Sequence, residues 1–202
     1  MDDTFSLDAL LAARQTVSPR RLVAPGPEGA QLAALLAAAG HAPDHGCLLP
    51  WRLVLVPQAA RAALGEAFAQ ALLARDPEAG AEAVARAREK AARAPLLLLL
   101  VVRLVGGDAA IGADERLVSA GCAVQNLLLA ATAQGFGSAL ASGKALQSAP
   151  LRALFALGEG ERALCFINIG SVEKRRPLRA RPGPECYVEL LQPGQGRRPW
   201  ME

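Results

Sequence analysis

The stretch from Leu117 to Gly143 carries no formal charge over 27 consecutive residues, long enough for a helix to cross a bilayer. A membrane-spanning helix needs roughly 20 continuous apolar residues. This stretch is instead interrupted by polar side chains, including Gln125 and Asn126, and it contains Gly135 before its end. We therefore expect a buried helix of a soluble protein and no membrane span.

The flanking residues set the limits of this helix. Asp114 and Glu115 stand at its start, where acidic side chains interact favourably with the helix dipole. Gly135 ends it, because glycine readily adopts the left-handed conformation of a helix C-terminus. The sequence predicts a helix from Asp114 to Gln134, buried on nearly all sides, and then a turn up to Gly143. Such a helix needs neighbours all round, and a second subunit is expected to supply some of them.

Composition favours one domain over residues 1–202, since 52% of the chain is hydrophobic and only 4% is aromatic. The net charge of +3 is too small to indicate a nucleic-acid partner. The cysteines form no C-x-x-C pair, so neither a disulfide framework nor a zinc site is indicated. Asp2 and Asp3 replace the basic start of a signal peptide, and we expect a cytoplasmic protein.

Helices alternate irregularly with a few strongly apolar strands, which favours an α+β layer fold over a doubly wound one. The glycines match neither a dinucleotide fingerprint nor a P-loop, because Gly135 and Gly137 follow a helix and not a strand. Further helices are predicted at 7–13, 28–39, twice between 58 and 93, and from 150; strands are predicted at 52–56, 96–102, 163–169 and 187–191.

The two histidines, His41 and His45, are four residues apart, a spacing that chelates metals on a continuous helix. Pro43 stands between them and disfavours helical geometry at Ala42, so we expect no metal site. Two interpretations stay open, a polar loop or contact with a ligand. No serine or cysteine lies in a nucleophile-elbow context, and no catalytic dyad is indicated.

Two groups of cations allow a structural and a functional interpretation. Arg14 and Thr16 end the first predicted helix, where a cation complements the helix dipole, yet a guanidinium beside a hydroxyl also suits phosphate. A basic cluster near the C-terminus is either solvated surface or an anion contact, and it lacks the interleaved aromatics of an RNA-binding segment. Its members are Lys174, Arg175, Arg176, Arg179 and Arg181.

Several segments, taken in order, resemble one family. They read L-x-x-R-Q-T ending at Thr16, A-P-D-H-G ending at Gly46 with P-W at 50–51, S-A-G-C-A-V-Q-N at 119–126, A-A-T-A-Q-G-F-G at 130–137, and S-G at 142–143. From about Ser6 to Lys174 the chain resembles the flavin-dependent nitroreductase family, specifically its small single-domain NAD(P)H nitroreductases.

This resemblance implies a three-layer α+β fold, in which helices flank a central mixed or antiparallel sheet. It also implies an intertwined homodimer with FMN at the interface and a C-terminal tail, residues 176–202, that reaches the partner subunit. The resemblance places FMN contacts at Arg14, Gln15, Thr16, His41, His45, Leu140, Ala141, Ser142, Lys174 and Arg175. It places the nicotinamide nucleotide at Ala130, Ala131, Thr132, Ala133, Gln134 and Gly135.

The chain departs from its relatives at three of these positions. Gln15 and Ala141 stand where the family has arginine, and Leu140 replaces a tryptophan. A hydrogen bond to a charged group contributes roughly 1.5–3 kcal/mol, so FMN would bind less tightly unless other cations compensate. Arg20, Arg21, His41 and the basic cluster are the candidates for this compensation.

The implied activity is reduction of nitroaromatics, quinones or similar small molecules by NADH or NADPH, in ping-pong turnover. Because the chemistry would take place on flavin N5, no side chain is expected to act as a catalytic residue, and neither a metal nor a nucleic-acid partner is expected. Two alternatives stay open. One is another flavin reaction, such as dehalogenation, dehydrogenation or flavin breakdown, and the other is a non-catalytic dimer that has lost its flavin.

Overall fold

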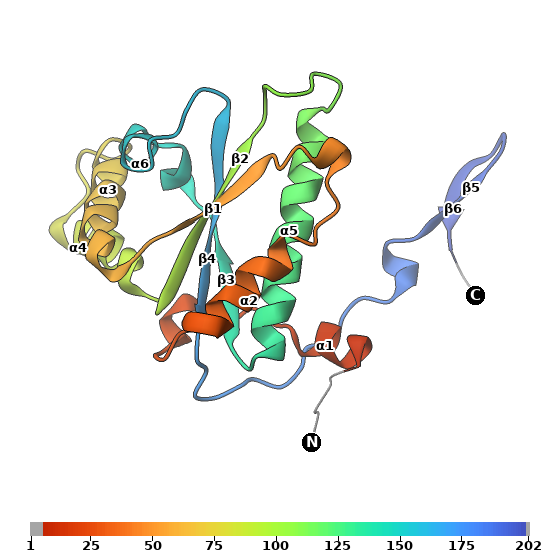
Figure 1. Ribbon diagram of the computed structural model, residues 1–202, viewed down its shortest axis with the longest axis horizontal. Coiled ribbons are helices and arrows are strands. Elements are labelled where there is room, and N and C mark those ends of the chain that lie inside the picture. The colour runs from red at the N-terminus through yellow and green to blue at the C-terminus, as the bar shows by residue number, and fades with distance from the viewer. Residues whose placement is uncertain (1–5, 201–202) are drawn as a thin grey trace.

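The computed structural model describes residues 6–200. Asp2 and Asp3, on which the expectation of a cytoplasmic protein rests, lie outside the described residues. At the centre is a four-stranded antiparallel sheet in the spatial order β1-β2-β4-β3 (Figure 1). Its strands are β1 (Trp51–Leu55), β2 (Leu96–Arg103), β4 (Glu161–Gly170) and β3 (Gly137–Ala141).

Helices cover both faces of this sheet (Figure 1). Leu98 and Leu100 of β2 pack in one core with α2 and α5, whereas Leu97 and Leu99 pack in a second core with α3 and α6. Because both faces are covered, β2 is apolar at every position except its last, as the leucine run predicted. The predicted three-layer α+β fold is confirmed.

The α-helices are α1 (Leu7–Ala13), α2 (Gly29–Ala39), α3 (Arg61–Leu73), α4 (Ala81–Glu89), α5 (Ala113–Ala133) and α6 (Ala149–Leu154). Short 3₁₀ turns lie at Pro19–Arg21, His45–Cys47, Gln58–Ala60, Lys90–Ala92, Lys144–Gln147 and Pro184–Cys186. The helix expected from Glu28 begins one residue later, because Glu28 is its extended N-cap.

The long apolar helix is α5, and it ends as predicted. Gly135 has a φ of +85°, its N–H donates to the carbonyl of Thr132, and the N–H of Phe136 donates to that of Ala131. This pair of bonds is the Schellman motif, which satisfies the last carbonyls of the helix. By length and composition α5 could cross a membrane, but half of its most apolar window is buried inside this fold.

In a single chain α5 is open on one side, where a second subunit is expected to supply neighbours. Val118, Gly121 and Gln125 are exposed and lie on one side of the helix at helical spacing. The sheet, α2 and α1 pack against other parts of α5, and nothing among residues 6–200 covers this stripe.

The turn expected between Gly135 and Gly143 is also wrong, because β3 occupies Gly137–Ala141. A Cβ at Gly137 would lie 2.3 Å from Val172 Cγ2 and 3.0 Å from Val17 Cγ2. Two segments distant in sequence therefore meet at this glycine. The N–H of Val17 donates to the carbonyl of Ser138 over 2.9 Å, which places the segment after α1 along the edge of β3.

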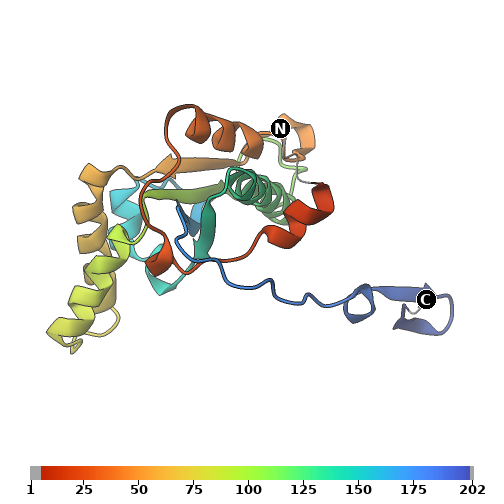
Figure 2. The ribbon, with the colours of Figure 1, turned by 90° about the horizontal axis from the view of Figure 1, so that it is seen from below.

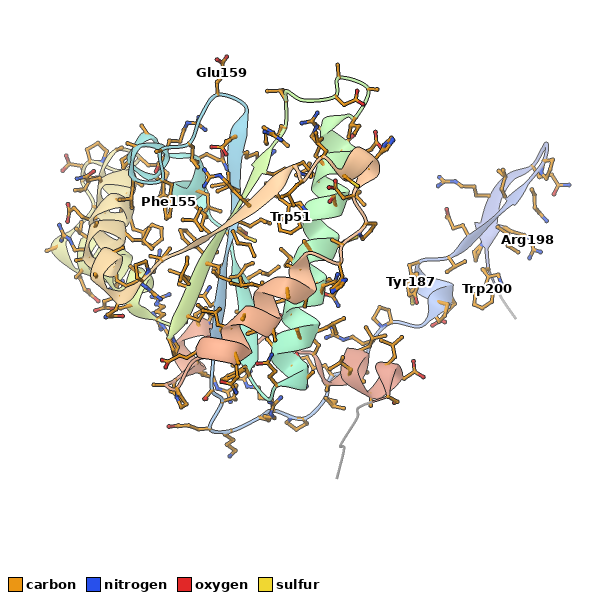
Figure 3. All side chains as sticks on the ribbon, viewed as in Figure 1. Trp51, Phe155, Glu159, Tyr187, Arg198 and Trp200 are labelled. Carbon is orange, nitrogen blue, oxygen red and sulfur yellow. The ribbon has the colours of Figure 1, made fainter. Side chains whose placement is uncertain are left out.

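After Ser171 the chain leaves the sheet as an extended arm (Figure 2). The arm carries a two-stranded hairpin, β5 (Glu189–Gln192) and β6 (Gly196–Pro199), so the strand predicted at 187–191 is shifted and its partner strand was missed. Figure 3 shows Tyr187, Arg198 and Trp200 on this arm, away from the sheet. Leu191 is 77% exposed. A lone two-stranded hairpin is only marginally stable in water.

An ion pair crosses the sheet from β1 to the start of β4. Arg52 Nε lies 2.8 Å from Glu161 Oε1, and Arg52 Nη2 donates to Glu161 Oε2 over 3.0 Å. The N–H of Gly158 also donates to Glu161 Oε2. Arg52 first, and then this backbone hydrogen bond, lower the pKa of Glu161 to about 2, against the opposing effect of burial.

The substitution Gly137→Ala is expected to destabilise the fold by about 1–3 kcal/mol, because the added methyl group has no room between Val17 and Val172. Urea denaturation of both proteins measures the loss. Gly80→Ala is the matched control, since a Cβ there meets no atom within 4 Å. Equal stability of Gly137→Ala and the unsubstituted protein would show that the segments do not meet this closely.

The substitution Glu161→Gln is expected to cost about 1 kcal/mol at pH 7, because a partly exposed bidentate pair is lost. A carboxylate with a lowered pKa stabilises the fold above its unfolded pKa, and this contribution disappears as pH falls from 4.5 towards 2. Urea denaturation should therefore show a difference between the two proteins that shrinks across this range. Glu82→Gln, in an exposed pair, is the control. A difference independent of pH would contradict the assignment.

Candidate functional site

A pocket of about 190 Å³ lies where the segment after α1, the end of α5 and the start of the arm meet; we name it the tail pocket. It brings together four of the predicted cofactor residues from segments far apart in sequence, and Thr132 of the predicted nicotinamide stretch lines it as well. The four are Gln15, Thr16, Lys174 and Arg175.

The tail pocket is strongly cationic. Five basic residues line it, and none of its described lining residues is acidic. Arg175 Nη2 donates to the carbonyl of Gly135 over 2.6 Å, and the Arg21 guanidinium donates to the carbonyl of Lys174, so two of the cations are fixed by backbone contacts. The hydroxyl of Thr16 together with these cations is a set of donors that fits a phosphate group. The five are Arg21, Lys174, Arg175, Arg176 and Arg179.

Arg14 lies beside this pocket without lining it. Its carbonyl accepts a hydrogen bond from Arg181 Nη2 over 3.4 Å. Burial, and then the nearby charge of Arg181, lower the pKa of Arg14. The basic cluster of the tail is thus folded back against the end of α1, which adds positive charge around the tail pocket.

A second pocket of about 570 Å³ lies between α3, α4 and the end of β3; we name it the α4 pocket. Ala141 and Ser142 line it, whereas Leu140 is 47% exposed and lines neither pocket. The turn Pro19–Arg21 stands between the two pockets, with Arg20 facing the α4 pocket and Arg21 the tail pocket. Six of the ten predicted cofactor residues are therefore divided between two pockets, four in the tail pocket and two in the α4 pocket.

The predicted nicotinamide stretch is the last turn of α5 and its cap. Thr132 Oγ1 donates to the carbonyl of Leu128 over 2.8 Å. Gln134 Nε2 donates to the carbonyl of Gln31, and Gln134 Oε1 is buried without a partner among residues 6–200. The remaining members, Ala130, Ala131, Ala133 and Gly135, complete this helix end.

The histidines are at the other end of α5. His45 Nδ1 lies 2.7 Å from Glu115 Oε2, and this contact raises the pKa of His45. The rise per residue of an α-helix puts Glu115 about 26 Å from Thr132 along the axis. His41 is exposed in the loop after α2. Within one chain, the structure does not bring the histidines to either pocket.

Sequence reasoning missed most of the residues that line the α4 pocket. Arg86, Lys90 and Arg93 all line this pocket, although Arg86 and Lys90 are largely exposed to solvent. Their spacing of four and three residues, which places them on one side of a helix, was the available signal. Asn168 of β4 also lines the pocket and is 3% exposed.

Comparisons with known proteins identify the family of this chain. The sequence profile of the Nitroreductase family matches residues 12–171. A predicted NAD(P)H nitroreductase of Haemophilus influenzae is 33% identical over 165 residues, covering 82% of this chain and 89% of that protein. The predicted NAD(P)H nitroreductase YdjA of Escherichia coli K12 is 32% identical over 185 residues, covering 90% and 98%.

Solved structures share the fold. A nitroreductase-like family protein from Bacillus cereus superposes with a TM-score of 0.81 at 21% identity, covering 95% of this chain and 99% of that one. NfnB, an FMN and NADPH-dependent nitroreductase from Sphigopyxis sp., gives a TM-score of 0.68 at 21% identity, covering 92% and 99%. On the profile match and the identity to curated relatives, this chain belongs to the nitroreductase family.

Proposed function

We propose that this chain is an FMN-dependent oxidoreductase that uses NADH or NADPH to reduce a small acceptor such as a nitroaromatic or a quinone. The tail pocket carries the proposal, because it gathers Thr16, Lys174 and Arg175 into one cationic cradle. The names of the curated relatives, NAD(P)H nitroreductases, support the donor, and that of NfnB supports FMN as the cofactor.

The tail pocket would hold the phosphate of FMN. Thr16 offers a hydroxyl, and Lys174 and Arg175 offer charge. Arg21 lines the same pocket and supplies a cation that Gln15 does not. The loss of charge at Gln15 is thereby offset by a neighbour, and the lost-flavin alternative becomes less favoured.

The α4 pocket would receive the ring end of the cofactor, with Ala141 and Ser142 at its edge. When bound, FMN supplies hydride acceptance and donation, so the chain need not provide a nucleophile or a general base. Arg20, Arg93 and Lys144 line this pocket, and fixed cations stabilise negative charge that develops nearby. Donor and acceptor would occupy the same space in turn.

We further propose a homodimer built on the uncovered face of α5. The stripe of Val118, Gly121 and Gln125 is exposed. Helix α1 is uncovered as well, since none of its residues is buried and Leu7 is 67% exposed. The arm, with its unsupported hairpin, would lie on the partner subunit. Obligate interfaces of this kind bury on the order of 2,000–5,000 Å².

The dimer would complete each site. His45 and the tail pocket are at opposite ends of α5, so one chain cannot bring them together. If two copies of α5 pack antiparallel about a two-fold axis, His45 of the partner subunit approaches the tail pocket. Each cofactor would then contact both subunits.

The substitution Lys174→Gln is expected to raise the Kd for FMN about tenfold or more, because a charged hydrogen bond to phosphate is lost. Thr16→Val should raise it by a smaller factor. Titration of the purified protein with FMN, followed by absorbance and protein fluorescence, measures both. Arg162→Gln, an exposed cation on β4, is the control and should leave the Kd unchanged.

The same loaded protein, given NADH or NADPH and a nitroaromatic, should oxidise the nucleotide. If no FMN binds even at high FMN concentration, the proposed cofactor is wrong. Binding of FMN without oxidation of either nucleotide would contradict the proposed activity and favour a non-catalytic dimer.

A further inference from the structure

The α4 pocket contains far more positive charge than a site for neutral molecules requires. Six cations line it, from four separate segments, and none of its described lining residues is acidic. Arg86 contacts the carboxylate of Glu82; the other five form no side-chain ion pair with any residue between 6 and 200. The six are Arg20, Arg75, Arg86, Lys90, Arg93 and Lys144.

Two of these charges, on Arg93 and Arg20, are close enough to repel each other. Arg93 is half-buried, and burial followed by the nearby charge of Arg20 lowers its pKa, which the charge of Glu89 only partly opposes. Like charges gathered at a partly buried site destabilise each other unless an anion lies between them. A bound anion would relieve this repulsion, and a neutral ligand would not.

Beneath the cations the pocket is apolar and aromatic. Phe68 and Phe166 pack edge to face, with ring centroids 5.5 Å apart, and Leu72 and Leu146 extend the same surface. Asn168 is the buried polar side chain of this floor; its Nδ2 donates only weakly, over 3.5 Å, to the carbonyl of Ala139. Buried amides ordinarily have better partners than this, so Asn168 is available to a polar atom of a ligand.

The wall that carries the cations is held in place. Arg61 is buried on α3 and donates to three backbone carbonyls, those of Val56, Ala91 and Pro95. The carbonyls of Ala91 and Pro95 lie on either side of Arg93 in the chain, and Ala91 directly follows Lys90. The cations at 90 and 93 therefore stand on backbone fixed before any ligand arrives, which lowers the entropic cost of binding.

We propose that the α4 pocket selects electron acceptors in which a flat unsaturated ring carries a carboxylate group. The ring would rest on Phe68 and Phe166, and the carboxylate would contact the cations of α4 and its flanking turns. This inference rests on the proposed function, since it names the class of acceptor for that site. The aromatic floor suits a flat ring, and the cations around it suit a carboxylate on that ring.

The reaction balances without any further reactant. A nitro group takes up two electrons and two protons to give a nitroso group and water. NAD(P)H supplies both electrons and one proton as hydride, and solvent supplies the second proton: ArNO₂ + NAD(P)H + H⁺ → ArNO + NAD(P)⁺ + H₂O. The carboxylate is unchanged throughout and acts only in recognition.

The test compares 4-nitrobenzoate with 4-nitrobenzamide, its neutral analogue of nearly the same shape. We expect kcat/KM to favour the benzoate by about fivefold or more at low salt, and the preference to fall as ionic strength rises. The double variant Arg75→Gln, Lys90→Gln should remove most of this preference. Arg162→Gln, the control, should keep it. An equal preference in the double variant and the unsubstituted protein would overturn the proposal.

A second measurement does not depend on turnover. Calorimetric titration with benzoate and with benzamide, in the absence of nucleotide, should show tighter binding of benzoate, and the double variant should lose the difference. If the double variant instead changes only the ratio of NADPH to NADH use, the cations serve the donor and the proposal is wrong. Failure to reduce either nitro compound would contradict the proposed function, and the binding of benzoate against benzamide would still test this inference.

Discussion

The close approach at Gly137 is the contact on which the rest of the site depends. Because this residue has no Cβ, Val17 from the N-terminal segment and Val172 from the segment after β4 can both pack against the start of β3. The same approach places Thr16 beside Ser138 and Lys174 beside the end of α5. Three segments that are far apart in sequence thereby become the walls of one cationic pocket.

The second constraint is the length of α5. Its C-terminal end supplies Thr132 to the tail pocket, whereas its N-terminal end holds Glu115 and, through it, His45. A straight helix keeps these ends about 26 Å apart. We propose that a second subunit brings the N-terminal end of its α5, with His45, to each tail pocket. The exposed stripe along α5, the uncovered α1 and the projecting arm are consistent with this.

The sequence determined some of these features locally and left others to long-range packing. The Schellman end at Gly135 and the buried β2 follow from the local pattern, and both were predicted. The strand β3 was not, because alanine, serine and leucine carry no strand preference and only pairing with β4 and the approach at Gly137 make it extended. The cations of the α4 pocket converge from four segments, so no local pattern could reveal that they share one cavity.

Subunit complementation tests the central claim that each cofactor site draws on both chains. A His45→Ala chain and a Lys174→Gln chain each carry a defect in every site of their own homodimers. In a mixed dimer, both defects fall on one site and the other site is intact. We predict that co-refolded mixtures bind FMN tightly at one site per mixed dimer. If the mixture has no more tight FMN sites than the average of the two homodimers, each site lies within a single chain.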